Sequence, residues 1–371
     1  MNDQDIKYLK MTIALAEKGI GRVSPNPLVG TVIVKNSEII SRGYHKYCGG
    51  DHAEIDAMKN AKQSLRGAEL YVNLEPCAHF GRTPPCTDQI IKAKIKRVVI
   101  GMKDPNPITC GRGIRKLLKA GVLVEICKQN QAYEDLNEIF TKYITAKSPF
   151  VCVKTGQSLD GKIATATGQS KWITSESLRN KAQYLRKKYD CIMVGINTIL
   201  KDNPYLSCRY QNKLENDIPI KLIIDSHLKT PFKANIFSKL SPAPVMIATT
   251  KFAAKEKISR FNDMGVDVLV CGHEESKNVD LKYLMSQLYK NEISSVLVEG
   301  GGQINGACFD LRLVDRICFF TALKIIGGKN AVNSVAGKGI SNLQKAIIID
   351  KARITKLDKD LLIQGKVKYS P

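Results

Sequence analysis

Three side chains between Asp51 and Cys86 could bind a zinc ion. His52 offers an imidazole, and Cys77 and Cys86 offer two thiolates. Three such ligands leave one open position on a tetrahedral zinc ion, and a position open to water is typical of catalytic zinc sites. Glu54 follows His52 by two residues, close enough to exchange protons with a metal-bound water. The pattern predicts a hydrolytic zinc centre in which Glu54 is the catalytic proton shuttle.

Two helix starts are needed to bring these side chains together. Residues two apart in a helix point about 200° apart, so His52 and Glu54 can face one ion only if the helix begins there. We expect Asp51 to cap this helix. Cys86 follows two prolines and precedes the amphipathic stretch 87–96. It is therefore predicted at a second helix start, where the positive end of the helix dipole favours a thiolate.

Two other interpretations of the cluster stay open. Cys48 or His79 could supply a fourth ligand and close a purely structural zinc site, or the cysteines could simply pack in a core. A closed site would leave Glu54 without a role. The catalytic interpretation is therefore favoured.

Helix and strand patterns alternate around the zinc motif. The first 19 residues predict a helix, and a hairpin with a polar turn at 35–38 follows it. Further strands are predicted at 68–76 and 97–107, then a helix and a strand within 111–126. A single amphipathic helix is predicted from about residue 131 to just before Pro149. This alternation predicts a three-layer α/β domain over 1–147 and a second domain over 148–371.

A glycine-rich turn marks the second half. The apolar run 295–298 leads into Gly300, Gly301 and Gly302 and then into a helix-compatible segment. Such a turn presents backbone amides and a positive helix end to a pyrophosphate. The signature G-x-G-x-x-G is absent, which disfavours an ordinary Rossmann domain. An ordinary tight turn remains the alternative. A polar turn at 158–162 is a second place where the backbone could approach a ligand.

Composition and charge limit the classes of function. The 371 residues are 43% hydrophobic, enough for two cores, and the formal charge of +22 comes mostly from scattered lysines, so no nucleic-acid stripe is evident. No export signal or membrane-spanning run is found, and we expect a cytoplasmic protein without a membrane partner. The 11 cysteines do not suggest a disulfide framework. Eight of them are predicted to be small buried hydrophobes: Cys110, Cys127, Cys152, Cys191, Cys208, Cys271, Cys308 and Cys318.

The motif H-x-E followed by P-C resembles that of the zinc nucleobase and nucleotide deaminases. Here eight residues, AHFGRTPP, separate the two cysteines, and this longer loop resembles the pyrimidine deaminases of riboflavin biosynthesis. The resemblance implies a cytidine-deaminase-like fold. It also implies substrate contacts by Asn26, by His79 and Arg82 in the loop, and by residues 104–107. Turn chemistry is the alternative for Asn26, and plain exposure is the alternative for His79.

The second half resembles the dihydrofolate-reductase-like domain that follows the deaminase in bifunctional riboflavin enzymes. The landmarks SLDGK, SKWITSE and SVLVEGGGQINGACF occur in the same order. The resemblance implies that NADPH contacts Gly156, Trp172, Thr198, Asp202, Ser226, Gly301, Gly302, Gln303, Ile304, Asn305, Gly306 and Ala307. It implies substrate contacts by Ser170, Arg186, Leu206, Arg209 and Glu299. The arginines would hold a sugar phosphate and Glu299 the ribose hydroxyls, with surface solvation as the alternative for any single arginine.

The resemblance implies a bifunctional enzyme of riboflavin biosynthesis. The first domain would deaminate 2,5-diamino-6-(ribosylamino)-4(3H)-pyrimidinone 5′-phosphate with zinc. The second would reduce the ribosyl group of 5-amino-6-(5-phosphoribosylamino)uracil to ribityl with NADPH. We expect a homo-oligomer with a small phosphorylated nucleotide-like substrate. Two other functions compete: an RNA-editing deaminase, which leaves the second half unexplained, and a non-enzymatic binding protein, which the intact zinc motif disfavours.

Overall fold

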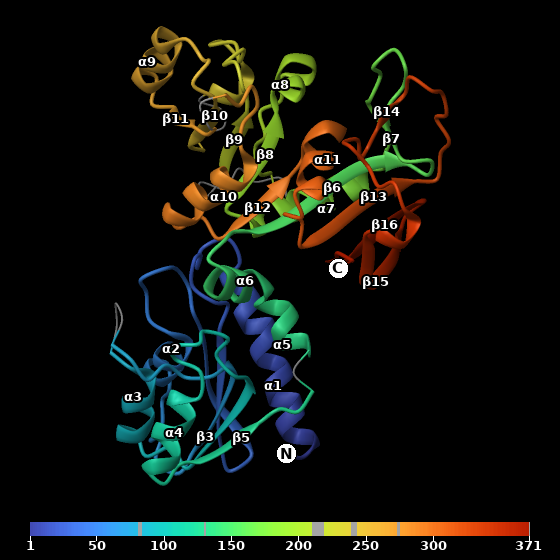
Figure 1. The fold of residues 1–371 in the computed structure, drawn as a ribbon. Coiled ribbons are helices and arrows are strands. Elements are labelled where there is room, and N and C mark those ends of the chain that lie inside the picture. Colours follow the sequence, from blue (N-terminus) through green and yellow to red (C-terminus); the bar gives the residue numbers. More distant parts are fainter. Residues whose placement is uncertain (81–83, 130, 210–218, 239–242, 273–274, 371) are drawn as a thin grey trace. The chain divides into compact units, whose positions relative to one another are not determined.

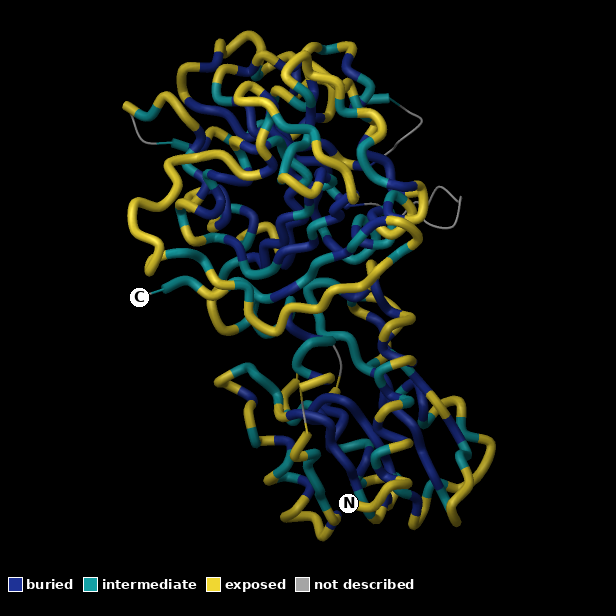
Figure 2. Tube along the Cα trace, turned by 90° about the vertical axis from the view of Figure 1, so that its right-hand side faces the viewer, coloured by how far each residue is buried: buried dark blue, intermediate teal, exposed yellow. Residues whose placement is uncertain are grey.

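The computed structural model describes residues 1–371 apart from 81–83, 130, 210–218, 239–242, 273–274 and 371 (Figure 1). The chain divides into two compact units, Met1–Ser148 and Pro149–Pro371. Figure 2 shows that the strands at the centre of each unit are buried, so each unit has its own core. Within the described residues, no helix combines the length and apolar character that crossing a bilayer requires.

A mixed sheet forms the middle of the first unit. Across the sheet, its described strands are β2 (Glu38–Tyr44), β1 (Gly30–Lys35), β3 (Glu69–Leu74), β4 (Arg97–Met102) and β5 (Leu123–Ile126). β1 pairs antiparallel with β2 and with β3, whereas β3, β4 and β5 run parallel. The predicted hairpin is confirmed. The carboxyl ends of the parallel strands meet at one edge, where ligand sites commonly form.

Helices cover both faces of this sheet. They are α1 (Asp3–Ala16), continued by the 3-10 turn η1 (Glu17–Gly19), then α2 (Ala53–Lys59), α3 (Cys86–Lys92) and α4 (Arg112–Lys119). Leu9 of α1 shares a core with Val32 of β1, and Leu117 of α4 shares the opposite core with Ile33. Because neighbouring strand residues point to opposite faces, the apolar run of β1 is buried on both sides. The predicted three-layer arrangement is confirmed.

The single helix predicted before Pro149 is wrong. The structure has α5 (Gln131–Leu136) and α6 (Glu138–Ala146), separated at Asn137. Asn137 is 2% exposed, and its amide group accepts from the backbone N–H of Leu28 at 2.8 Å and donates to the carbonyl of Leu28 at 3.1 Å. The helix therefore breaks where one side chain satisfies the backbone of a distant loop, a demand that helical periodicity does not record.

The second unit is built on a long, mostly parallel sheet. Its described strands follow the order β11 (Asp267–Val270), β10 (Val245–Thr249), β9 (Ile220–Ile224), β8 (Cys191–Gly195), β12 (Ser295–Val298), β6 (Phe150–Ser158), β13 (Arg316–Ala322), β16 (Asp360–Lys368) and β15 (Ile348–Leu357). Pairing is parallel from β11 to β13, and the hairpin of β15 and β16 adds antiparallel strands. β7 (Lys162–Ala164) pairs separately with β14 (Val332–Asn333).

Helices again lie on both faces of the long sheet. They are α7 (Glu176–Lys188), α8 (Ile196–Asp202), α9 (Lys255–Asp263), α10 (Leu281–Lys290) and α11 (Gly302–Asp310), with short 3-10 turns η3 (Asn235–Phe237) and η4 (Leu343–Lys345). Met193 of β8 shares one core with Leu284 of α10. Its neighbour Ile192 shares the other core with Phe261 of α9. The glycine-rich turn predicted between a strand and a helix is found between β12 and α11.

The cysteine prediction is partly wrong. Cys152, Cys191, Cys208, Cys271, Cys308 and Cys318 are buried as predicted. Cys110 is exposed and Cys127 is half-buried. Cys110 lies in the loop that precedes α4, where the chain is turning at the edge of the sheet rather than crossing a core.

Candidate active site

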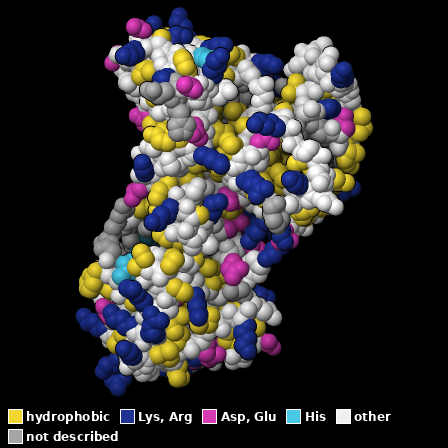
Figure 3. Space-filling view, viewed as in Figure 1, with side chains coloured by type: hydrophobic (Ala, Val, Ile, Leu, Met, Phe, Trp, Pro, Cys, Tyr) yellow, Lys and Arg dark blue, Asp and Glu magenta, His cyan; other side chains and the backbone are white. Residues whose placement is uncertain are grey.

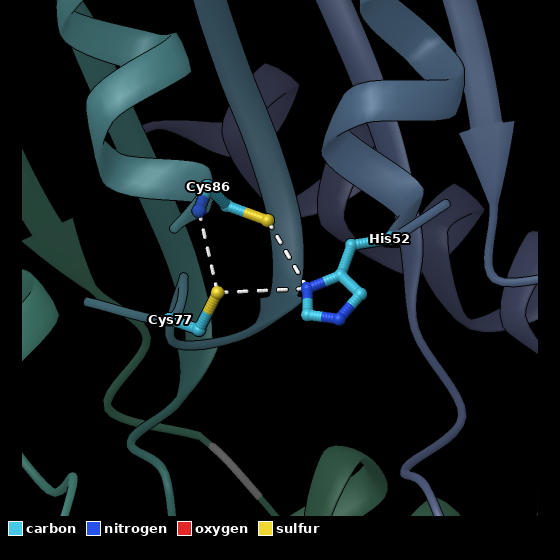
Figure 4. Close-up of side chains that lie close together, drawn as sticks. All are labelled: His52, Cys77 and Cys86. Atoms are coloured by element: carbon cyan, nitrogen blue, oxygen red, sulfur yellow. Dashed lines mark hydrogen bonds between the residues drawn. The ribbon is translucent and has the colours of Figure 1, made fainter. Parts of the chain in front are cut away.

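The three predicted zinc ligands lie together at the carboxyl edge of the first sheet. Their ligand atoms are within 4.8 Å of one another. The Nδ1 atom of His52 is 3.2 Å from the Cys86 sulfur and 3.5 Å from the Cys77 sulfur, and the backbone N–H of Cys86 donates to the Cys77 sulfur at 3.3 Å (Figure 4). No other His, Cys, Asp or Glu of the described residues joins the group. The set therefore leaves one zinc position open, and Cys48 and His79 do not close it.

Two helix starts aim these ligands at one point. His52 occupies the cap position of α2, and Cys86 is the first residue of α3 after Pro85. The prediction of Asp51 as the helix cap is wrong, because the helix starts one residue later and the Asp51 carboxylate instead pairs with Lys59 at 2.5 Å. Cys77 comes from the turn that follows β3. The ligands thus meet at the ends of rigid elements.

The charges within the cluster fit a divalent cation. The hydrogen bond from Cys86 and the nearby His52 lower the pKa of Cys77 to about 4. The hydrogen bond with Cys77 likewise raises the pKa of His52 to about 8. A thiolate and a positively charged imidazole therefore balance each other. Sulfur and imidazole donors in this geometry suit zinc, which would replace the proton that they share.

Glu54 lies in the first turn of α2 and is 3% exposed. Burial raises the pKa of its carboxyl group, which also interacts with the Cys86 thiol. A buried carboxyl group beside the ligand cluster is placed to take up a proton from a water and to give it back. The geometry supports the predicted shuttle role.

His45 was missed by the sequence analysis. It is 3% exposed and its ring lies edge-on to His52, with centroids 5.7 Å apart. Its Nδ1 atom is 2.9 Å from the Asp51 carbonyl, and its Nε2 atom is 3.2 Å from the side-chain amide nitrogen of Asn26. The structure therefore joins Asn26, a predicted substrate residue, to the segment that carries the first zinc ligand.

The structure describes only part of the first predicted substrate loop of this unit and all of the second. His79 is exposed, and Arg82 lies outside the described residues. Asp104 is half-buried, and its burial raises the pKa of its carboxyl group. Its oxygens accept from the backbone N–H of Asn106 and from the Thr109 hydroxyl, so the 104–109 turn is ordered from within.

In the second unit, the predicted cofactor residues gather along one edge of the sheet. Strands β9, β8, β12 and β6 are parallel neighbours in this sheet. Ser226 follows the end of β9, the glycine run follows the end of β12, and Gly156 lies near the end of β6. Thr198 and Asp202 lie in α8, which follows β8. Ser226 accepts from Val279 through its hydroxyl at 3.2 Å. β9 ends at Ile224, two residues before Ser226. Trp172 is 66% exposed and carries the Arg179 guanidinium 4.4 Å above its ring.

The glycine turn divides the predicted cofactor residues in two. Gly301 caps α11 and has open space beside it, and Gln303 is exposed. Ile304 and Ala307 are half-buried and pack against the core. Gly302 and Gly306 instead face segment 333–337, where an added Cβ would lie 2.2 Å and 2.0 Å from backbone oxygens. Asn305 is fully buried and donates to the Ser334 carbonyl at 2.7 Å. Open backbone at Gly301 fits a pyrophosphate, whereas the buried residues hold the turn in place.

The predicted substrate residues of the second unit include a buried ion pair. Arg186 donates to both carboxylate oxygens of Glu299, at 2.7 and 2.8 Å, and to the Ser207 carbonyl. Burial raises the pKa of Glu299, but the charges of Arg186 and Lys154 outweigh this and lower it to about 2. Arg186 therefore orients Glu299. Lys154, 3.6 Å from Glu299, was missed by the sequence analysis.

The other three predicted substrate residues of the second unit differ in exposure. Leu206 is 5% exposed, Ser170 is half-buried and Arg209 is exposed. The backbone N–H of Arg209 donates to the Gln183 side chain at 2.8 Å. Of the two predicted phosphate-binding arginines, Arg209 is thus the more accessible.

Comparison with known proteins bears on both units. Residues 149–363 match the family described as the RibD C-terminal domain, and residues 2–102 match the cytidine and deoxycytidylate deaminase zinc-binding region. Riboflavin biosynthesis proteins RibD from Actinobacillus pleuropneumoniae and Aquifex aeolicus are 42% and 39% identical, over 99% and 97% of this chain and 96% and 97% of theirs.

Solved structures agree. Acinetobacter baumannii RibD superposes with a TM-score of 0.86 at 32% identity, covering 98% of this chain and 99% of that one. A diaminohydroxyphosphoribosylaminopyrimidine deaminase/5-amino-6-(5-phosphoribosylamino)uracil reductase from Thermotoga maritima gives 0.83 at 35% identity, covering 99% of both chains. These matches confirm the predicted fold class, the pairing of deaminase and reductase, and the predicted cofactors, zinc and NADPH. The chain belongs to the RibD family of bifunctional riboflavin-biosynthesis enzymes.

Proposed function

We propose that residues 1–147 remove the 2-amino group of 2,5-diamino-6-(ribosylamino)-4(3H)-pyrimidinone 5′-phosphate by hydrolysis. We further propose that residues 148–371 reduce the ribosyl group of the deaminated product, 5-amino-6-(5-phosphoribosylamino)uracil, to ribityl. The observation that carries this proposal is the His52, Cys77 and Cys86 cluster with its open fourth position beside buried Glu54. A RibD C-terminal domain follows it in the same chain.

In the deamination, His52, Cys77 and Cys86 would hold zinc, which supplies a Lewis acid that makes a bound water acidic. Glu54 would accept a proton from the attacking water and deliver it to the departing ammonia, so that a C–N bond is exchanged for a C–O bond. Its burial and raised pKa suit both steps. Asn26, fixed by His45, would orient the pyrimidine ring.

In the reduction, NADPH would supply a hydride to the sugar C1′ as the C1′–O4′ bond of the ribose ring opens, and solvent would supply the proton for the released hydroxyl. The open backbone at Gly301 and the amino end of α11 would bind its pyrophosphate, and Gly156, Trp172, Thr198, Asp202 and Ser226 would complete the cofactor site. Glu299, oriented by Arg186, would accept ribose hydroxyls, and Arg209 would bind the substrate phosphate. Ser170 and Leu206 would line the same pocket.

We also propose a cytoplasmic homo-oligomer. None of the 11 cysteines forms a disulfide bond, which suits a reducing compartment. The edge strand β15 is exposed along nearly its whole length, with Ile348 and Ile354 at 54% and 66% exposure. A long open edge with apolar side chains invites pairing with another chain. On the face shown in Figure 3, the Lys and Arg side chains are spread out and form no single stripe, which favours a small anionic substrate over nucleic acid.

The test is an ultraviolet assay of the purified full chain with the diaminopyrimidine nucleotide, with and without NADPH, beside metal analysis. Wild type should deaminate the nucleotide alone and oxidise NADPH only as the deaminated product forms. Glu54→Gln should keep one zinc per chain and lose deamination by a factor of about 10² or more, since general acid–base catalysis contributes that much. The variant should still reduce supplied intermediate. Retained deamination would remove Glu54 from its role.

A further inference from the structure

Glu75 is a buried acidic residue between β3 and Cys77, and the chemistry above does not use it. It is 5% exposed. Its two carboxylate oxygens accept hydrogen bonds from four backbone N–H groups in and after the 104–111 loop. The donors are Asp104 (3.2 Å) and Gly111 (3.0 Å) to Oε2, and Gly113 (3.0 Å) and Ile114 (3.2 Å) to Oε1.

This carboxylate supplies what the start of α4 lacks. The cap position of α4 is Gly111, which has no side chain to accept a bond, and the first turn contains no acidic residue. The first N–H groups of a helix have no partner within the helix, and a negative charge stabilises them. Glu75, the residue after β3, supplies both the acceptor oxygens and the negative charge. The 104–111 loop and the start of α4 are therefore held to the end of β3.

The same residue fixes the turn that carries Cys77. The backbone N–H of Glu75 donates to the Met102 carbonyl at the end of β4, at 3.0 Å. An added Cβ on Gly113 would lie 2.1 Å from the Pro76 oxygen, so α4 rests directly on the residue before Cys77. Zinc ligands keep their orientation through contacts of this kind behind them.

We propose that Glu75 is a positioning residue that holds the Cys77 turn and the 104–111 loop in one fixed arrangement around the deaminase site. The Cys77 part follows from the geometry of the turn. The loop part rests on the proposed function, in which residues 104–107 contact the substrate. One buried side chain would then set both the geometry of the metal ligands and the fit of the nucleotide.

The variant Glu75→Gln tests this in the full chain. Glutamine has the same size, but its NH₂ group replaces one acceptor oxygen and meets N–H donors, so two of the four hydrogen bonds are lost. Competition with a chelator should show zinc affinity reduced by about tenfold or more, the usual effect of removing a residue that supports a metal ligand. The KM of deamination should rise by a similar factor, with NADPH oxidation on supplied intermediate unchanged.

Two matched variants separate positioning from simple helix stability. Asp280→Ala removes the cap of α10 in the second unit, where Asp280 accepts from Lys282 and Tyr283, and should leave zinc affinity and deamination KM unchanged. Thr109→Val removes the bond to Asp104 inside the loop and should raise KM while zinc affinity stays normal. If Glu75→Gln does not fold, Thr109→Val still tests the role of the loop in substrate binding. Glu75→Asp then tests the effect on zinc affinity.

The outcomes are distinguishable. A Glu75→Gln chain with a lower melting temperature but wild-type zinc affinity and KM would make Glu75 a helix cap alone and overturn the proposal. If the wild type does not deaminate the nucleotide but Glu75→Gln still weakens zinc, the proposed substrate is wrong and the ligand-positioning part stands.

Discussion

At the scale of single residues, the hydrogen bonds of His45 determine how Asn26 is presented. A backbone carbonyl only accepts, so the bond to Asp51 places the proton on Nδ1 of His45. Burial lowers the pKa of His45 and favours the neutral ring, whose Nε2 then accepts from the Asn26 NH₂ group. The amide oxygen of Asn26 consequently turns away from His45, and in the proposed function it would accept from an N–H of the pyrimidine.

His45→Phe should raise the KM of deamination about two- to tenfold, because one oriented hydrogen bond is worth about 0.5–1.5 kcal/mol. Zinc content should stay at one per chain, since the ring shape beside His52 is kept. Steady-state kinetics and metal analysis are the measurements. His227→Phe, an exposed histidine in the second unit, is the control. An unchanged KM would show that His45 does not set the orientation of Asn26.

The sequence is sufficient for the zinc site but not for its supports. The meeting of His52, Cys77 and Cys86 could be predicted because residue type and spacing together indicate a metal site. His45 could not, because its partners lie 6 and 19 residues away and a lone histidine has no local pattern. Lys154 and Glu299 meet only because β6 and β12 are neighbours in the sheet, which sequence spacing does not reveal.

At the scale of elements, a charge network ties α1 to the sheet at the end away from the zinc ligands. Arg97, the first residue of β4, bonds both carboxylate oxygens of Asp5 at 2.8 Å and also reaches Glu69 and Glu125 on the neighbouring strands. The Asp5 side chain is 3% exposed. Four elements are therefore joined through one guanidinium, whose fork geometry suits several carboxylates at once.

Asp5→Asn should destabilise the first unit by about 1.5–3 kcal/mol at pH 7, the range for a hydrogen bond to a charged group. The bond from Arg97 holds the pKa of Asp5 well below its ordinary 3.8. Its stabilisation is therefore fully present above that pH and lost as the pH falls below it. Urea unfolding of the wild type and Asp5→Asn, with a chelator present, at pH 7 and below pH 4, measures this difference in the free energy of unfolding. Exposed Asp3→Asn on the same helix should change little, and a pH-independent difference would contradict the account.

Element type was more predictable than element continuity. Alternation of apolar residues located the β1–β2 hairpin and the β12–α11 turn, because period and glycine content are local signals. The break at Asn137 depends on the backbone of Leu28, more than a hundred residues away. The roles of Gly302 and Gly306 likewise depend on segment 333–337, against which they pack too closely for any side chain.

At the scale of the whole molecule, each unit has its own sheets, cores and ligand. Strands β1–β5 all belong to Met1–Ser148 and β6–β16 to Pro149–Pro371. Zinc binding would therefore stabilise one unit and NADPH binding the other, because a ligand stabilises only the structure that must fold to bind it. The full chain should behave as two cooperative blocks rather than one.

Scanning calorimetry of the full chain should accordingly show two transitions that respond to different ligands. NADPH at a hundred times its Kd should stabilise the second unit by about 2.7 kcal/mol, which corresponds to roughly 5–10 °C for a unit of this size. The other transition should not move. A chelator should lower the first transition alone, and Cys77→Ser should mimic the chelator. If NADPH and chelator shift the same transition, the two units unfold together and their sites are energetically coupled.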